Sequence, residues 1–558
     1  MSERVAGSSG AVRAVRVPRR ELVLSGALAL LAGAICVAIA SPEDAPVHLY
    51  RTFLVDRGTL LWDNLWYAGH YPLAGYSLLY YFVAAVVGNL PLVFAGAVLS
   101  ALLFALIVFR QWGDAARWPV RIFGLLSAAP MFTGLYSYSL GFAAALAAVW
   151  AVQRHRSVLA VVFAVAALGF SPLAFLFLGL VLTSLWFVHR PLNRSVLVIA
   201  TGLTAAIAIE GSVLALFPSG GTYPFHWADL LCLVTLSALG YRVSQGDERA
   251  RPIAIFFVLW AVGAIVFWLI PGAVGDNWAR LRGVVFPLML LSAVLVRFRP
   301  RRLVLASLAA ALAYNLVPYA LQVPNWLNDR PAKSSYWAPA LTYLAAHADA
   351  AHRIEVVPTA DHWESYWMPK AGYALARGWY RQLDKQVSPV LYDSDLSATE
   401  YLHWLHEMAV AYVLLPATRL DQNGGPSERA LLLSGKTGLR VAYQTSTWTI
   451  YAVPHPSGII QGDSAATLTR LGHQTIAGTA SAAGRYLLRV RYTPYWVASG
   501  TIRCVGERAD GMTELVIARP GRFTLSIPSN LEKLLATPGF AAVVGGGTRH
   551  RACARAER

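Results

Sequence analysis

The chain has 558 residues, of which 56% are hydrophobic and only 14% are charged, and its mean hydropathy is +0.48. A soluble protein carries about 25% charged residues, so this composition excludes an ordinary soluble protein and indicates a polytopic membrane protein. The net charge of +17 does not indicate nucleic-acid binding, because the arginines lie mostly in short loops between apolar runs, where they encode membrane topology.

The apolar runs predict eleven transmembrane helices, within a transmembrane domain of residues 21–322. The basic N-terminus, residues 1–20, should stay cytoplasmic, and basic loops then mark the inner side. Residues 76–88 are expected as a helix that only dips into the membrane. The expected spans are about 21–40, 92–109, two within 119–152 that turn outside at "YSYSLG" (136–141), two within 157–188, then 195–216, 226–241, 253–270, 283–296 and 303–321.

From about residue 323 the chain becomes soluble in character and should lie outside the cytoplasm. Segments such as "HRIEVVP", "AVAYVLLP", "LRVAYQT" and "TWTIYAVP" are typical of strands, with helical stretches between them, so residues 323–455 predict an α/β domain. Alternating patterns in 484–528 predict a β-sandwich-like domain over 456–540. Residues 541–558 have the composition of a disordered basic tail.

The first apolar run and the cysteines bear on the compartment. The run is too long for the core of a cleavable signal and lacks a small-residue cleavage site, so we expect it to remain as an anchor. Cys504 and Cys553 can pair if the C-terminal region faces an oxidising compartment, and the sequence leaves this pairing open.

The first outer loop, residues 41–91, gathers titratable side chains. A helix over residues 44–57 would carry Asp44, His48 and Arg51 on one face and would lie at the membrane surface with its apolar side down. A carboxylate beside an imidazole can act as a general base. The alternative is that Asp44 only caps this helix and that His48 is an interfacial side chain.

Aromatic residues follow in the same loop. Tryptophan and tyrosine suit the membrane interface, but their faces also bind sugar rings, so we expect them to line a sugar pocket. Asp63 could bind sugar hydroxyls or be only a turn residue. The candidate substrate-binding residues of this segment are Trp62, Asp63, Trp66, Tyr67 and His70.

Arg280 and Arg282 lie in an expected outer loop, against the usual topological bias. A negatively charged ligand at the outer surface explains this placement, since a guanidinium grips phosphate through two parallel hydrogen bonds. The alternative is a surface ion pair with Asp276, which is itself a candidate substrate contact.

Further candidates lie elsewhere in the chain. Glu210 lies in the outer half of an expected span, where it would line the site from below or be neutral and hydrogen-bonded to a neighbouring helix. Residues 359–384 are rich in tryptophan and charge and would bind an acceptor glycan or form an interdomain contact. From this stretch we select Trp363 and Arg377 as substrate-binding candidates.

The order of these motifs resembles that of the C-type glycosyltransferase superfamily (GT-C). The residues that carry the resemblance are "DAPVHLYR", the Trp-rich segment, "YPLAGYSLLYY", "GDNWARLRGVVFPLML" and "ARGWYRQLD". Within the superfamily, the chain is most similar to bacterial membrane proteins labelled 6-pyruvoyl-tetrahydropterin synthase-related. The resemblance covers the membrane region and, more loosely, the C-terminal region.

The resemblance implies an inverting glycosyltransferase of the cell membrane that takes a sugar from a polyprenyl phosphate and adds it to an envelope glycan or protein. Asp44 would be the catalytic base, Arg280 or Arg282 would hold the phosphate, and His48 and Arg51 would orient the base or the phosphate. Some relatives use a divalent cation, Mg²⁺ or Mn²⁺, although the sequence shows no convincing ligand set.

Two other classes compete with this interpretation. A transporter or flippase of lipid-linked glycans would explain the many spans and Glu210, but no internal repeat is present, and charge gathers in one outer loop. A non-catalytic scaffold of envelope assembly would gain support if Asp44 were dispensable.

Overall fold

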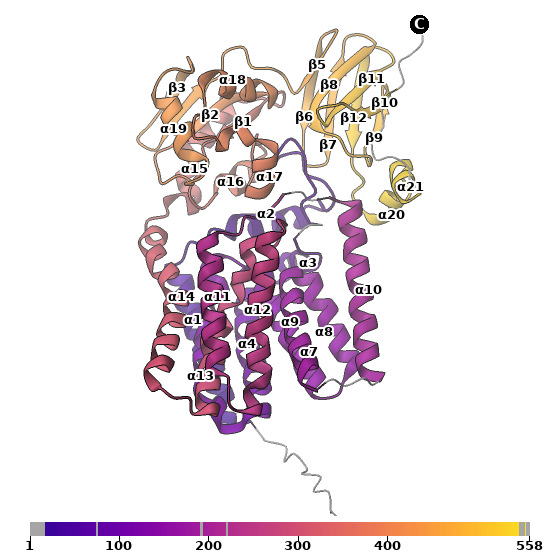
Figure 1. The fold of residues 1–558 in the computed structure, drawn as a ribbon. Helices are drawn as coiled ribbons and strands as arrows, with labels where there is room; N and C mark the ends of the chain where they lie inside the picture. Colours follow the sequence, from indigo (N-terminus) through magenta and orange to yellow (C-terminus); the bar gives the residue numbers. More distant parts are fainter. Residues whose placement is uncertain (1–16, 74–75, 190–193, 219–220, 546–552, 554–558) are drawn as a thin grey trace, which may run out of the picture.

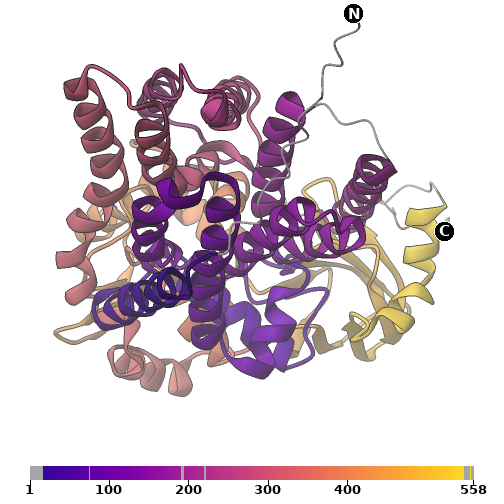
Figure 2. The ribbon, with the colours of Figure 1, turned by 90° about the horizontal axis from the view of Figure 1, so that it is seen from below.

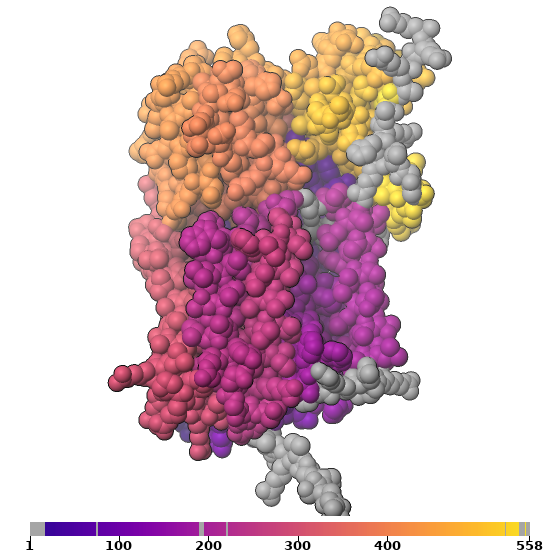
Figure 3. All heavy atoms as spheres, in the orientation of Figure 1, coloured from indigo at the N-terminus to yellow at the C-terminus, as the bar shows by residue number. Residues whose placement is uncertain are grey.

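The computed structural model describes residues 17–73, 76–189, 194–218, 221–545 and 553. Long helices form a bundle, and two smaller domains that contain β-sheets lie side by side over one end of it (Figure 1). Viewed from the opposite end, the bundle helices are seen nearly end-on with the two C-terminal domains behind them (Figure 2). The space-filling view shows both C-terminal domains seated directly on the bundle (Figure 3).

The helical domain has a helix at each position where the sequence predicts a span. Its helices are α1 (Arg19–Ile39), α2 (Ala45–Asp56), α3 (Tyr80–Val87), α4 (Asn89–Trp112), α5 (Arg117–Leu126), α6 (Ala129–Thr133), α7 (Tyr136–Gln153), α8 (Ser157–Phe170), α9 (Pro172–His189), α10 (Arg194–Leu216), α11 (Trp227–Val243), α12 (Arg251–Leu269), α13 (Val285–Val296) and α14 (Arg301–Leu327), with 3₁₀ helices η1 (Gly113–Ala116), η2 (Glu248–Ala250) and η3 (Gly275–Val284).

Six helical segments of the described chain are long and apolar enough to cross a membrane. Side chains such as Leu30, Ile209 and Leu321 are exposed on these segments, as expected of surfaces that face lipid. A multi-pass membrane domain is therefore supported, whereas the number of eleven crossings remains a prediction. The six segments are Arg19–Ile39, Asn89–Thr133, Ser195–Leu216, Glu248–Leu269, Gly275–Val296 and Arg301–Leu327.

One predicted turn is misplaced. The "YSYSLG" segment, expected as an outer turn, is helical and begins α7, while the chain reverses earlier, at Gly134. Gly134 has a φ of 77°, and a Cβ atom there would lie 2.7 Å from the backbone nitrogen of Ala45. Only glycine allows this close approach, which brings the α6–α7 turn against the start of α2.

Helix α2 also differs from expectation. A surface helix with one polar and one apolar face was predicted, but residues on all its sides are buried, including Val47, His48, Tyr50, Arg51 and Leu54. The reason is that α2 lies between the bundle and the α/β domain, where it packs against α3 and α16 (Glu364–Lys370).

The α/β domain has one four-stranded sheet in the order β1-β2-β4-β3. Strands β1 and β2 are parallel, and the other pairs are antiparallel. All four strands lie within the segments predicted as strands, and β3 and β4 form an antiparallel hairpin. The elements are β1 (Arg353–Val356), β2 (Val410–Pro416), β3 (Arg440–Gln444) and β4 (Trp448–Ala452), with α15 (Ser334–His347), α16, α17 (Arg381–Val387), α18 (Ala398–Glu407), α19 (Gly425–Leu433), η4 (Arg330–Ala332) and η5 (Pro389–Tyr392).

The last domain is a sandwich of two antiparallel sheets, ordered β10-β11-β8-β5 and β6-β7-β12-β9. Alternate residues such as Leu488, Leu515 and Leu525 fill the space between the sheets, which explains the period-two pattern of the sequence. The elements are β5 (Ile460–Gly462), β6 (Ala466–Leu471), β7 (Thr475–Ala480), β8 (Gly484–Arg491), β9 (Val497–Gly500), β10 (Ile502–Glu507), β11 (Met512–Ile517), β12 (Gly521–Ser526), α20 (Leu531–Leu535) and α21 (Pro538–Val544).

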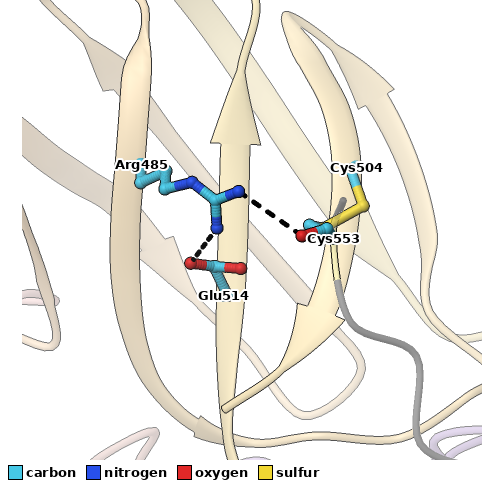
Figure 4. The surroundings of a disulfide bond; sticks show 4 residues. All are labelled: Arg485, Cys504, Glu514 and Cys553. Atoms are coloured by element: carbon cyan, nitrogen blue, oxygen red, sulfur yellow. Dashed lines mark hydrogen bonds and ion pairs between the residues drawn. A yellow bond between two sulfur atoms is a disulfide. The ribbon is translucent and has the colours of Figure 1, made fainter. Parts of the chain in front are cut away.

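The C-terminal segment is more ordered than its composition predicts. Residues 541–544 belong to α21, and Cys553 forms a disulfide bond with Cys504 of β10 (Figure 4). Arg485 of β8 binds the Glu514 carboxylate at 2.8 Å and also donates to the carbonyl oxygen of Cys553 at 3.4 Å. The pairing that the sequence left open is therefore present, and the other residues of 546–558 lie outside the described part of the chain. A disulfide is typical of an oxidising compartment.

Candidate active site

A cavity of about 300 Å³ lies where the helical domain meets the α/β domain. Its walls combine the residues before α2, the loop before α3, the 3₁₀ helix η3, parts of α7, α11 and α14, and a short segment that leads into α17. Its polar and aromatic lining consists of Glu43, Asp44, Tyr76, Phe123, Ser127, Thr133, Tyr138, Phe142, Tyr223, Asp229, Asp276, Asn277, Arg280, Arg282, Tyr314, Asn315, Tyr319, His362, Trp379, Tyr380, Arg381 and Gln382.

Asp44 lies at the wall of this cavity, at the N-terminal boundary of α2. Its side chain does not cap the helix, so the capping alternative does not describe its contacts. The backbone N–H of Asp44 donates to the carbonyl oxygen of Thr133 at 3.3 Å. One carboxylate oxygen lies 3.5 Å from a terminal nitrogen of Arg280. The backbone of Asp44 is thus bound to the end of α6, while its carboxylate faces the cavity and a guanidinium.

The surroundings of Asp44 tune its acidity. Burial raises the pKa of the carboxyl group from 3.8 to about 6, and the positive charge of Arg280 acts in the opposite direction. Arg381 and His362 of the α/β domain also lower this pKa, whereas Glu43 raises it. A carboxylate with a pKa just below neutrality is ionised at pH 7 yet is more basic than an exposed aspartate, which suits a general base.

The two arginines predicted to hold a phosphate both line the cavity. They lie on η3, whose tight winding sends their side chains to different partners. Arg280 reaches Asp44, whereas Arg282 lies over the rings of Tyr314 and Tyr319, at 5.6 Å and 5.4 Å from the ring centres. No carboxylate pairs with Arg282 in the described residues, so its guanidinium is available to an anion.

Asp276 shares the cavity but not the contact that the sequence suggested. Among the described residues it forms no ion pair with Arg280 or Arg282, so the surface-pair alternative is not observed. One of its carboxylate oxygens is buried without a hydrogen-bond partner. Asp276 therefore remains a candidate substrate contact.

His48 and Arg51 do not line the cavity, which corrects the prediction that they share an exposed face with Asp44. The His48 ring is enclosed by the rings of Tyr76, Tyr80, Tyr81 and Tyr136, with centroids 5.2 to 5.8 Å away. Burial lowers the pKa of His48 well below its usual range, so the ring is neutral. Arg51 lies 4.6 Å from the ring centre of Tyr76. Both residues contact Tyr76, which lines the cavity, and neither lines the cavity itself.

Asp63 is an interdomain contact. Its carboxylate accepts hydrogen bonds from the Tyr50 hydroxyl and from Nδ1 of His473, each at 2.8 Å. Burial by itself would raise the pKa of Asp63, but His473, His70 and the Tyr50 hydroxyl together outweigh this effect and hold the pKa below its usual range. The residue thus joins the first outer loop to the turn between β6 and β7, and it does not line the cavity.

The aromatic residues predicted to form the sugar pocket are buried packing residues. Trp66 is fully enclosed, stacked on Tyr50 at 4.6 Å and on His70 at 5.3 Å. A Cβ atom at Gly378 would lie within 2.9 Å of Trp66 and 2.7 Å of Tyr67, so the α/β domain backbone covers both rings. Trp62 packs on Tyr71 and Trp496. The C-terminal domains cover this part of the loop. The predicted pocket residues therefore do not line the cavity; they are Trp62, Trp66, Tyr67 and His70.

Three more candidates lie outside the cavity. Trp363 donates from its indole nitrogen to Asp329 at 2.8 Å, near the junction of α14 and the α/β domain. Arg377 is buried among Asp384, Glu428 and Glu355, at 2.7, 3.5 and 3.6 Å. Glu210 lies on α10 and is not part of the cavity wall. The first two are internal contacts of the C-terminal region, which corrects their selection as glycan contacts.

The residues that sequence analysis missed are tyrosines and a short segment of the α/β domain. Trp379, Tyr380, Arg381 and Gln382 line the cavity, and the indole of Trp379 donates to the carbonyl oxygen of Glu43 at 3.0 Å. The stretch 359–384 was singled out for its composition, but the pattern could not tell which of its side chains face the bundle.

The described residues contain no group of three or more His, Cys, Asp or Glu side chains that could hold a metal ion. Because no three of the acidic residues that line the cavity come together, they do not fit a preformed Mg²⁺ or Mn²⁺ site.

No protein-family model matches the chain, and no curated protein matches it either. Among solved structures, the chain is similar to the arabinofuranosyltransferase AftD from Mycobacteria, with a TM-score of 0.48 and 17% sequence identity. This similarity covers 79% of the present chain and 40% of that protein, so the chain spans less than half the length of AftD. A likeness of this strength carries no functional argument, and the geometry of the cavity must carry the functional conclusion.

Proposed function

We propose that the protein is an inverting membrane glycosyltransferase that moves a sugar from a polyprenyl phosphate to an acceptor outside the cytoplasm. The observation that carries this proposal is the pairing of Asp44 with Arg280 in the wall of a cavity at the junction of the helical and α/β domains. A basic carboxylate and a phosphate-binding cation are the two groups that such a reaction needs, and here they are neighbours.

Asp44 accepts the proton of the acceptor hydroxyl. The acceptor oxygen attacks the anomeric carbon from the face opposite the phosphate, so the new glycosidic bond forms with inversion. The bond between the anomeric carbon and the phosphate oxygen breaks, and the polyprenyl phosphate leaves with the bonding electrons. The pKa of about 6 lets Asp44 take up this proton at neutral pH.

The arginines stabilise the charge that develops on the departing phosphate. In this proposal Arg282, whose guanidinium contacts two tyrosine rings and forms no ion pair within the described residues, binds the phosphate. Arg280, which contacts Asp44, adds a second positive charge. In a site with little water such fixed positive charges are worth far more than in bulk solvent. Asp276 lies on the same 3₁₀ helix and lines the same cavity, and in this proposal it binds a sugar hydroxyl.

The acceptor approaches from the side of the α/β domain. His362, Trp379 and Arg381 line that side of the cavity and offer an aromatic face and polar groups to a glycan. An envelope glycan or protein is the proposed acceptor, and the proposed setting is the bacterial cell membrane, with the N-terminus in the cytoplasm. Membership of the GT-C superfamily, and within it of the 6-pyruvoyl-tetrahydropterin synthase-related proteins, is part of this proposal.

A transporter or flippase remains the rival class. Transporters bind their cargo near the membrane midplane, on discontinuous helices of repeated halves. The cavity described here instead adjoins the C-terminal domains at one end of the bundle, which favours chemistry at the membrane surface.

The test compares Asp44→Asn with the unaltered protein in membranes supplied with radiolabelled polyprenyl-phosphate sugars of several kinds. We expect transfer by the unaltered protein and a loss of at least about 10²-fold in the variant at equal protein level. Equal transfer by both proteins would exclude Asp44 as the base. Flipping of the labelled lipid without glycosidic bond formation would favour the transporter. The same assay with a chelator tests the Mg²⁺ or Mn²⁺ requirement.

A further inference from the structure

Arg51 is a buried cation that lacks an anion. It is 4% exposed, and no carboxylate pairs with it in the described residues. Its guanidinium instead lies 4.6, 5.5 and 5.9 Å from the ring centres of Tyr76, Tyr380 and Tyr81, and it donates to the Tyr81 hydroxyl at 3.4 Å. Burying a charge is costly, so an arginine held by three aromatic rings and one hydroxyl group, without a carboxylate, calls for a reason beyond stability.

Two of these rings, those of Tyr76 and Tyr380, form part of the cavity wall. Tyr76 comes from the first outer loop, and Tyr380 comes from the segment just before α17 of the α/β domain. The ring centroids are 6.2 Å apart with an interplanar angle of 76°, so the rings meet edge to face across the domain boundary. Arg51 lies near both rings and is not itself part of the cavity wall.

Both rings lie beside the proposed base. Burial raises the pKa of both hydroxyl groups, and the negative charge of Asp44 adds to this effect. The adjacent Trp379 fixes Tyr380 in place, since its indole nitrogen donates to the carbonyl oxygen of Glu43. Two half-buried aromatic rings therefore adjoin the carboxylate, where a reacting sugar must lie.

We propose that Tyr76 and Tyr380 form the platform on which the sugar beside Asp44 is bound, and that Arg51 is the positioning residue that holds the two rings together. The C–H face of a sugar ring packs on an aromatic face, while its hydroxyls reach polar groups at the rim of the platform. This inference rests on the proposed function and places the sugar pocket on residues other than Trp62, Trp66 and Tyr67.

If the two tyrosines form this platform, replacing either one should weaken the binding of sugar-loaded lipid and spare the binding of sugar-free lipid. The experiment measures the dissociation constant of the purified full-length protein for a short-chain polyprenyl phosphate, with and without a panel of attached hexoses and pentoses. The variants are Tyr76→Leu and Tyr380→Leu, and the matched control is Tyr443→Leu, a half-buried tyrosine of β3 that stacks on Tyr343 and does not line the cavity.

We expect each platform variant to bind the sugar-loaded lipid about tenfold more weakly while its affinity for the sugar-free lipid stays constant. A parallel arm measures the KM for short oligosaccharide acceptors. A loss confined to the loaded lipid assigns the donor sugar to the platform, and a loss confined to the acceptor assigns the acceptor sugar. Equal losses for loaded and sugar-free lipid, or no loss in either arm, would overturn the platform.

Arg51 is tested in the same way. Arg51→Lys retains a charge but cannot cover two rings, and Arg51→Met retains length without charge. We expect both variants to lose sugar-dependent affinity and to keep affinity for the sugar-free lipid, which a general loss of folding would not produce. If the unaltered protein bound neither lipid, the proposed function itself would fail. Tight binding of both lipids without preference, together with an unchanged KM for acceptors in the platform variants, would overturn only the platform.

Discussion

One carboxylate oxygen of Asp44 lies 3.5 Å from a terminal nitrogen of Arg280, although 236 positions separate the two residues in the sequence. The contact is long for an ion pair, and both groups face the same cavity. It therefore restrains the carboxylate and leaves it free to accept a further hydrogen bond. A base that must accept a proton and a cation that must meet a phosphate can both remain available in such an arrangement.

The pH dependence of transfer should report the ionisation of Asp44. Because only the carboxylate can accept a proton, kcat/KM should rise with pH through about 6 and then level off. Arg280→Gln removes a positive charge that lowers this pKa, so its rising limb should move to higher pH. We also expect kcat/KM at the plateau to fall by about 10²-fold, since a charge-stabilising group is lost.

Arg282→Gln is the matched comparison for Arg280→Gln. The Arg282 guanidinium contacts Tyr314 and Tyr319 and has no contact with Asp44. Its loss should therefore lower the plateau value of kcat/KM and leave unchanged the pH at which kcat/KM rises. A limb that stayed at the same pH in Arg280→Gln would show that another group controls the profile.

Asp44 should reduce the stability of the protein at neutral pH. Its carboxyl pKa is raised by burial in the folded state, so the folded protein binds the proton more tightly than the unfolded chain does. The resulting decrease in the free energy of unfolding is absent below about pH 3.8, grows as the pH rises, and is complete above about pH 6. The shift corresponds to about 3 kcal/mol at most.

Asp44→Asn should therefore unfold at a higher temperature than the unaltered protein at pH 7.5, and the gain should shrink at pH 5. Thermal unfolding in detergent at both values measures this difference. A variant that is inactive and less stable at pH 7.5 would mean that the carboxylate has a structural role instead.

Local sequence patterns predicted the helices and strands better than they predicted which side chains face the cavity. The apolar runs and the period-two strands are each encoded within a few residues, so the helices and the sheets could be anticipated. The contact between Asp44 and Arg280 joins residues 236 positions apart, and no local pattern predicted it. The prediction of a turn at 136–141 was wrong because the chain reverses at Gly134, the position that permits the close approach to Ala45.

Roles that depend on contact between domains could not be anticipated. Trp66 and Tyr380 are both aromatic residues near polar groups, yet the first is sealed by Gly378 and the second faces the cavity. Likewise Arg377 is internal and Arg381 is at the cavity, although only four positions separate them. The sequence of each stretch is compatible with either placement, and the docking of the α/β domain decides between them.

Arg377 should be essential for folding of the α/β domain. It is the partner of three buried carboxylates, and Arg377→Met would leave Glu355, Asp384 and Glu428 without their cation. Removal of one partner from a buried ionic network costs about 3–5 kcal/mol. Thermal unfolding should show this loss, and protein that remains folded at low temperature should keep its KM for glycan acceptors. A raised KM with unchanged stability would restore the glycan-contact interpretation.

The Asp63–His473 contact should hold the first outer loop to the β-sandwich domain. Asp63→Asn keeps the shape of the side chain but removes the charge that binds Nδ1 of His473 at 2.8 Å, so we expect about 1.5–3 kcal/mol of destabilisation at pH 7. Because the pKa of Asp63 is lowered in the folded state, its contribution is present above the pKa of the unfolded chain. It is lost as the pH falls through the folded-state pKa, so the difference between the two proteins should shrink in acid.

Asp56→Asn is the control for Asp63→Asn, since Asp56 ends α2 as an exposed residue. Limited proteolysis of the link between the α/β and β-sandwich domains, at pH 7 and at acid pH, should separate Asp63→Asn from both the control and the unaltered protein. Because Asp63 lies outside the cavity, the pH limb of transfer should remain that of the unaltered protein. If that limb moved instead, Asp63 would have to act on the reaction.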